Sequence, residues 1–87
     1  MARSGELLLK RLAQERIESG ALPCDPGARM WGSRGSGASC ALCGEPIGPD
    51  EIEYEVEMRV NGGTEPLQFH RVCHSVWHTE CEGEAAR

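Results

Sequence analysis

The chain of 87 residues is poor in the large side chains from which small proteins build a core. It has one Phe, one Tyr and two Trp, and hydrophobic residues make up 39% of it. Chains of this size bury only about 60% of the surface that they expose when unfolded. A single domain of this composition therefore needs an additional cross-link, such as disulfides, a structural metal ion or oligomerisation.

Long apolar runs and internal repeats are also lacking. The three leucines that precede Lys10 form too short a run for a signal peptide, and no stretch approaches the length of a membrane span. These absences predict a cytoplasmic protein that does not contact membranes. In that compartment thiols stay reduced, so closely spaced Cys and His indicate metal ligands more readily than disulfides. Five cysteines are in any case an odd number.

A strongly basic face is missing as well. The net charge of −5 divides into six Lys/Arg against four Asp/Glu in residues 1–40 (+2) and three against ten in residues 41–87 (−7). Phosphate binding needs clustered cations, so nucleic acid is a disfavoured partner. The alternative hypothesis is a regulator that binds nucleic acid. It would bind through basic side chains of the N-terminal half: Lys10, Arg11, Arg16, Arg29 and Arg34.

Residues 1–20 are predicted to form a helix. Ser4 is suited to the N-cap and Gly20 to the position after the last turn. An apolar stripe on one face must dock on the rest of the protein; it comprises Leu9, Leu12, Ala13 and Ile17. Leu7 and Leu8 lie outside this stripe, which favours a second contact surface.

Residues 21–39 are expected to form a connector rich in Gly and Pro, because they show neither helical nor strand periodicity. Trp31 stands in this connector and has two interpretations. An isolated Trp in a loop is usually tucked against the edge of the core. Together with Met30, Arg29 and Arg34 it could instead form an exposed recognition surface.

The region 40–81 carries the chemistry. Cys40 and Cys43, followed by Gly44, form a C-x-x-C-G turn in which two thiolates can bind one ion at about 2.3 Å.

Residues 51–60 alternate apolar and charged side chains without a fault, which predicts a half-buried strand with its glutamates facing solvent. Residues 61–64, NGGT, predict a hairpin turn of two or four residues. Pro66 places the return strand at a sheet edge.

The stretch FHRVCHSVWHTEC, residues 69–81, is predicted to be helical from about His70 to Glu80. His70 and Cys73 are three positions apart and can meet the same ion. They complete a structural zinc site with Cys40 and Cys43. Residues 82–87 are expected to form a flexible tail.

This combination of C-x-x-C and FHRVC resembles the treble-clef zinc fingers, and it is similar to one module of a LIM domain. The resemblance covers residues 40–78. It implies an α+β domain with a zinc knuckle, a β-hairpin and a C-terminal helix, to which the N-terminal helix and connector are added. It also implies one structural Zn²⁺ bound by Cys40, Cys43, His70 and Cys73.

Other ligand sets remain open. His70, His74 and His78 are four positions apart and could bind a metal on one helix face, and Cys24 could replace a ligand if the connector folded back. Cys81 is too far along the helix to reach the same ion. Cys24 and Cys81 are otherwise expected to be free thiols.

The function predicted from these features is a non-enzymatic protein-interaction or adaptor module stabilised by zinc. The motifs of metalloproteases and zinc deaminases are missing, and a four-ligand site leaves no position for a reactive water. A protein partner is expected to bind through the N-terminal helix or the loop around Trp31. A third hypothesis is a redox switch in which oxidation of Cys40 and Cys43 releases the zinc.

Overall fold

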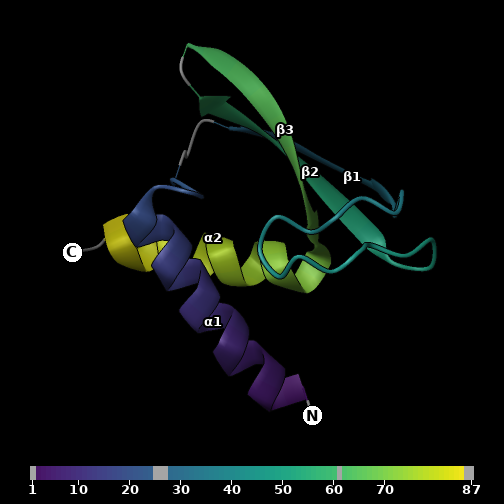
Figure 1. Ribbon diagram of the computed structural model, residues 1–87, viewed down its shortest axis with the longest axis horizontal. Helices are drawn as coiled ribbons and strands as arrows, with labels where there is room; N and C mark the ends of the chain where they lie inside the picture. The colour runs from purple at the N-terminus through teal and green to yellow at the C-terminus, as the bar shows by residue number, and fades with distance from the viewer. Residues whose placement is uncertain (1, 25–27, 61, 86–87) are drawn as a thin grey trace.

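The computed structural model describes residues 2–24, 28–60 and 62–85 and has an α+β fold (Figure 1). A long helix, α1 (Ala2–Ser19), is followed by three strands, β1 (Arg29–Arg34), β2 (Ile52–Val60) and β3 (Gly63–His70), and by a second helix, α2 (Arg71–Ala85). The strands form one antiparallel sheet in the order β1-β2-β3. The sheet stands over α2, and α1 crosses α2 and extends away from the sheet toward the N-terminus.

The hairpin has the register expected for the shorter of the two predicted turns. Val60 pairs with Gly63, and farther along the strands Tyr54 pairs with Phe69. Pro66 lies on β3, which is an outer strand, so the predicted edge position is confirmed. The register brings the side chains of Tyr54 and Phe69 to the same face of the sheet, where both contact α2.

Strand β1 was not predicted, because it lies within the connector that was expected to lack regular structure. It pairs antiparallel with β2 and places Trp31 beside Glu55. All six of its residues are exposed, and Trp31 keeps 44% of its surface accessible. The expectation that Trp31 is tucked against the core is therefore wrong. Trp31 and its neighbours are instead exposed, as the second interpretation proposed.

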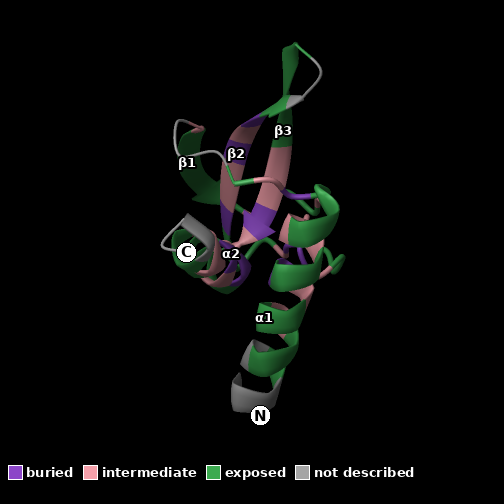
Figure 2. Ribbon diagram, turned by 90° about the vertical axis from the view of Figure 1, so that its left-hand side faces the viewer, coloured by how far each residue is buried: buried purple, intermediate pink, exposed green. Residues whose placement is uncertain are grey.

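The core lies between the sheet, the two helices and the loop before β2 (Figure 2). The ring of Trp77 stacks on Phe69 at 5.2 Å between centroids, and its indole nitrogen donates a hydrogen bond to the carbonyl of Leu22. The predicted stripe of α1 is confirmed, since Ala13 is fully buried and the other three residues pack around it. Leu22, Leu42 and Ile47 are buried as well, although no periodic pattern marks them.

Strand β2 departs from the predicted alternation at one end. Glu53 was expected to face solvent, but it is 4% exposed, whereas its apolar neighbour Ile52 is 46% exposed. The loop after β1 folds over this end of the sheet, and Ser36 donates two hydrogen bonds to Glu53 Oε1, from its backbone N at 3.0 Å and from Oγ at 2.8 Å. These bonds compensate for the burial of the carboxylate.

The helix boundaries differ slightly from those predicted. Helix α1 begins at Ala2, two residues before the predicted N-cap Ser4, and it ends as predicted before Gly20, which has a φ of 84°. His70 belongs to β3, so α2 begins at Arg71, and it continues to Ala85 through most of the expected tail. Residues 1, 86 and 87 lie outside the described residues.

Cys24 and Cys81 form a disulfide, so the prediction that they are free thiols is wrong. Their Cα atoms are 5.6 Å apart although 57 positions separate them in the sequence. The bond attaches the segment after α1 to the last turns of α2, beside the Trp77–Leu22 hydrogen bond.

Gly35 is the position where an added methyl group should disturb the fold most directly. Its backbone N donates to Glu51 O at 2.9 Å, and an ideal Cβ would lie 1.9 Å from Gly48 O. Gly35→Ala should therefore lower the free energy of unfolding by about 3 kcal/mol, the upper part of the range for overpacked sites. Urea unfolding followed by circular dichroism measures this loss.

Gly5→Ala is the matched control for this substitution. Gly5 lies in α1, and nothing is within 4 Å of its would-be Cβ. Because alanine favours helix over glycine, stability should stay equal or rise by up to about 1 kcal/mol. Equal effects of the two substitutions would contradict the close approach of Gly35 to the backbone of Gly48.

Candidate metal centre

The first half of the site is a tight turn that presents Cys40 and Cys43. Gly44 donates its backbone N–H to Cys40 O at 2.9 Å and has a φ of 82°, a conformation that glycine adopts readily. Cys40 N donates to Glu45 O at 2.9 Å and closes the turn from the other side. Ala41 N donates to Gln68 O at 2.7 Å. This last bond fixes the turn against β3.

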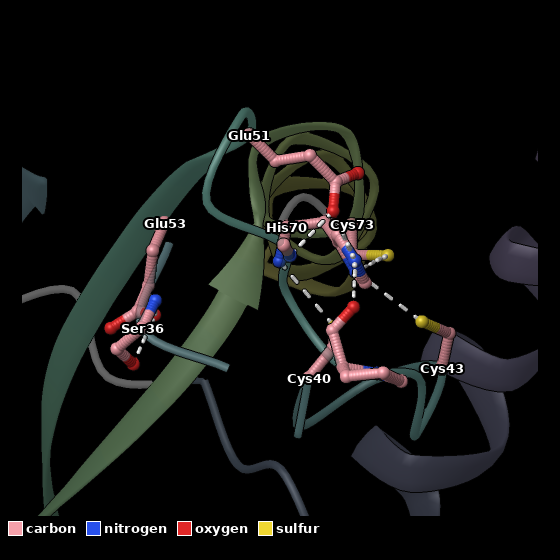
Figure 3. Close-up of polar contacts among 9 residues, drawn as sticks. Ser36, Cys40, Cys43, Glu51, Glu53, His70 and Cys73 are labelled. Carbon is pink, nitrogen blue, oxygen red and sulfur yellow. Dashed lines mark hydrogen bonds and ion pairs between the residues drawn. The ribbon is translucent and has the colours of Figure 1, made fainter. Parts of the chain in front are cut away.

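The second half of the site is the junction between β3 and α2. His70 is the last residue of β3, and Cys73 lies in the first turn of α2. The change from strand to helix turns both side chains toward the Cys40–Cys43 turn (Figure 3). One ligand atom from each of the four residues lies within 4.8 Å of every other.

The ring of His70 is oriented by bonds on both of its nitrogens. Nε2 lies 3.2 Å from Pro46 O and 3.7 Å from Glu51 Oε1, while Nδ1 lies 3.4 Å from Cys43 Sγ and 3.8 Å from Cys73 Sγ. A carbonyl can only accept, so the bond to Pro46 requires the proton on Nε2. The lone pair of Nδ1 then faces the sulfurs, as in histidine ligands whose other nitrogen donates to the protein.

The three thiols are not equivalent. The hydrogen bond from the Cys73 thiol, assisted by backbone N–H groups and opposed by burial, lowers the pKa of Cys40 to about 4. The same hydrogen bond, with burial and the nearby thiolate charge, raises the pKa of Cys73. Burial is the main cause that raises the pKa of Cys43. A bound cation would favour the thiolate forms of Cys43 and Cys73, which these effects disfavour.

His70 responds to the same negative charge. Burial of its ring favours the neutral form, but the hydrogen bond and charge of Cys40, followed by the charge of Glu51 and the carbonyl of Pro46, together raise its pKa. The cluster therefore attracts positive charge, whether as a proton on the ring or as a metal ion.

The donor set fits one zinc ion. Ligands at about 2.0–2.3 Å in a tetrahedron are about 3.5–3.8 Å from one another. The distances from His70 Nδ1 to Cys43 Sγ and Cys73 Sγ already lie close to this range. Three thiolates and one imidazole are ligands typical of structural zinc. Cys40, Cys43, His70 and Cys73 could therefore hold a single ion without a large rearrangement.

The other ligands considered from the sequence lie elsewhere. His74 packs edge-on against Tyr54 and Phe69, and His78 lies 4.0 Å from Glu82. Cys24 and Cys81 are joined to each other. In residues 2–24, 28–60 and 62–85, the cluster of three Cys and one His is the only group of this kind with metal-binding geometry.

Several residues around the site were not predicted from the sequence. Arg16 of α1 donates from Nε to Leu42 O at 3.3 Å, so the helix contacts the turn between the two cysteines. Pro46 and Glu51 approach His70 from the loop before β2. Leu42, between Cys40 and Cys43, is fully buried. No sequence signal marks Arg16, but an apolar residue inside a C-x-x-C turn is a sign that the turn faces a core.

Comparison with known proteins found no relative: no family model matches the chain, and no similar curated protein or solved structure was found. Within the described residues, neither helix combines the length and apolar character needed to cross a membrane. The interpretation of the site therefore depends on its own geometry and donor chemistry.

Proposed function

We propose that the protein is a small, non-enzymatic protein-interaction module whose fold is stabilised by one structural zinc ion. The observation that carries this proposal is the convergence of Cys40, Cys43, His70 and Cys73, whose ligand atoms lie within 4.8 Å of one another. A site with four protein ligands leaves no open position for water or substrate. Its role is then to connect parts of the chain.

The arrangement of the ligands supports a treble-clef-like finger. One pair comes from the Cys40–Gly44 turn, and the other comes from the strand–helix junction after the β2–β3 hairpin. In this proposal, β1 and α1 are additions around the finger. Helix α1 contributes Ala13 to the core and the Arg16 contact to the turn.

Two surfaces are suited to binding a protein. Leu7 and Leu8 on α1 are 68% and 63% exposed, and Met30 and Trp31 on β1 are 47% and 44% exposed. The chain is acidic overall, and Arg16, one of its few cations, contacts the Leu42 carbonyl. A protein partner is therefore better supported than nucleic acid.

Cobalt substitution tests whether the site is structural. Native mass spectrometry should find one zinc per chain, and the Co²⁺ form should show the thiolate-to-metal absorption of a tetrahedral site. Added azide, cyanide or imidazole should leave this spectrum unchanged, because no coordination position is open. A spectrum that shifts with these ligands would indicate an open, catalytic type of site and would contradict the proposal.

Variants identify the ligands in the same experiment. His70→Ala and Cys43→Ser should each weaken zinc binding by at least about a hundredfold, the upper range for loss of groups that support a metal site. Two variants are the controls and should retain one ion: the single variant His74→Ala, and the double variant Cys24→Ser with Cys81→Ser. Loss of zinc from the His74 variant would favour the alternative histidine site.

A further inference from the structure

We propose that the outer edge of β1 is the binding surface of this module, and that its partner is an extended segment that alternates basic and apolar residues. The segment adds to the sheet as a fourth strand beside β1. This inference rests on the proposed function, for which it supplies the contact surface and the chemistry of the partner. Four features of the strand support it.

The first feature is that β1 is an open edge. Its pairing with β2 occupies one side, and among the described residues no other helix or strand packs against it. Every residue from Arg29 to Arg34 is exposed. Figure 2 shows β1 on the side of the sheet away from α1. The strand contains no proline, so each of its outward-facing backbone N–H groups can donate to an added strand.

The second feature is the direction of the backbone groups. Gly35 N donates to Glu51 O, so the N–H of Gly35 points toward β2. The backbone N–H and C=O groups of successive residues alternate in direction along an antiparallel strand. Those of Trp31 and Ser33 therefore point toward β2 as well. The N–H and C=O groups of Met30, Gly32 and Arg34 then point outward. They offer three donors and three acceptors to an added strand.

The third feature is a cation site on the outer face of the sheet. Trp31 pairs with Glu55, which in turn receives a hydrogen bond from Gln68 at 3.5 Å. Of the neighbouring carboxylates, Glu53 is buried and hydrogen-bonded by Ser36, and Glu57 lies opposite Arg29 in the register of the strands. A Lys or Arg side chain opposite Trp31 would lie on the indole and approach the Glu55 carboxylate.

The fourth feature is the ring of Tyr54, which lies over Gly32 on the face toward α2. Gly32 pairs with Tyr54, and a Cβ on Gly32 would lie 3.1 Å from the tyrosine ring. Without that Cβ, no side chain of β1 separates the ring from the open edge. Met30 and Ile52 flank this ring and are 47% and 46% exposed. An apolar side chain opposite Gly32 would cover Tyr54 and reduce the exposure of this apolar surface.

These two faces fix the pattern of the partner, because successive side chains of an added strand alternate between them. A basic residue falls beside Trp31, and an apolar residue falls opposite Gly32. A second copy of the chain fits less well. It carries a net charge of −5, and pairing centred on Gly32 would oppose two glycines and leave the ring of Tyr54 uncovered.

The test is a titration of the zinc-loaded protein with a capped synthetic peptide that alternates lysine and valine. Amide spectra should show saturable shifts centred on β1, and hydrogen exchange should slow at Met30, Gly32 and Arg34, whose N–H groups become bonded. A peptide with glutamate in place of lysine should bind at least about tenfold more weakly, and the difference should shrink at high salt.

Matched variants separate the backbone from the side chains. Met30→Pro removes one outward N–H and should weaken binding by at least about tenfold, whereas Met30→Ala keeps that donor and should change affinity only a few-fold. Gly32→Val should also weaken binding, because its side chain would displace the Tyr54 ring that the apolar residue of the partner covers. Glu55→Gln should cost about three- to fivefold, and Glu65→Gln, on the opposite edge strand, should have no effect.

Several results would overturn this inference: no binding by folded, zinc-loaded protein; shifts centred on α1; equal binding of the glutamate peptide; or equal affinity of the Met30→Pro and Met30→Ala variants. Dimerisation through β1 without peptide binding, seen by sedimentation, would also overturn it. None of these affects the zinc stoichiometry or the cobalt spectrum. Failure of the surface is therefore distinguishable from failure of the proposed function.

Discussion

Chelation of the zinc is expected to unfold residues 40–85 in one cooperative transition. Structural zinc sites contribute about 10–16 kcal/mol in finger peptides at neutral pH, and the total stability of a small domain is about 5–15 kcal/mol. A zinc ion bound at this site would therefore contribute as much free energy as the stability of the whole protein. No other single change in this chain should have a larger effect.

The structure explains why the effect should extend beyond the ligands. The site joins the Cys40–Gly44 turn to the β3–α2 junction, and Leu42 is buried within that turn. Without the ion, the hydrogen bond with Cys40, burial and the charge of the neighbouring thiolates raise the pKa of Cys73. Release of the turn would expose Leu42 and Ile47, two of the largest fully buried side chains.

Circular dichroism with and without EDTA measures this loss, and Cys73→Ser should reproduce it at saturating zinc. The matched control is the double variant Cys24→Ser with Cys81→Ser, which also removes two sulfurs but should retain the EDTA response. Full retention of the helical signal and of a cooperative melt after verified removal of the metal would contradict a structural role for the ion.

Loss of the Cys24–Cys81 disulfide is expected to have the second largest effect, about 4 kcal/mol. This value follows from the loop-closure entropy for the 57 positions that separate the two cysteines. For a domain of this size each kcal/mol corresponds to about 4–8 °C, so the melting temperature should fall by roughly 15–30 °C.

The melting temperature should fall because the contact between α1, α2 and the segment that follows α1 is weakened. The disulfide holds this segment beside Trp77, whose indole donates to Leu22 O at 3.2 Å. Calorimetry of the zinc-loaded double serine variant, and of wild type treated with a phosphine reductant, should give the same fall. Zinc content should remain one per chain. An unchanged melting temperature, or loss of the ion together with the disulfide, would contradict this account.

The parts of the fold that depend on neighbouring residues could be predicted from the sequence. Alternation along residues 51–60 and the turn residues after them gave the hairpin, and the residue pairing of the shorter turn is the one observed. The four candidate ligands were also predicted, because two short spacings, C-x-x-C and H-x-x-C, each place their members together locally. Gly20 ended the first helix as expected.

Features that depend on distant contacts were missed. Every residue of β1 is exposed, so its sequence carries no alternation, and only its backbone bonds to β2 make it a strand. The Cys24–Cys81 pair joins residues 57 positions apart, which no local pattern can indicate. Glu53 looks like its neighbours in the sequence, yet the loop that carries Ser36 covers it.

X-ray absorption at the zinc edge of the purified protein is the most direct measurement of the central claim. Binding by Cys40, Cys43, His70 and Cys73 predicts three sulfur atoms at about 2.3 Å and one nitrogen at about 2.0 Å, with no further ligand. A first shell made mainly of nitrogen and oxygen, a coordination number of five or six, or protein that folds without binding metal would contradict it.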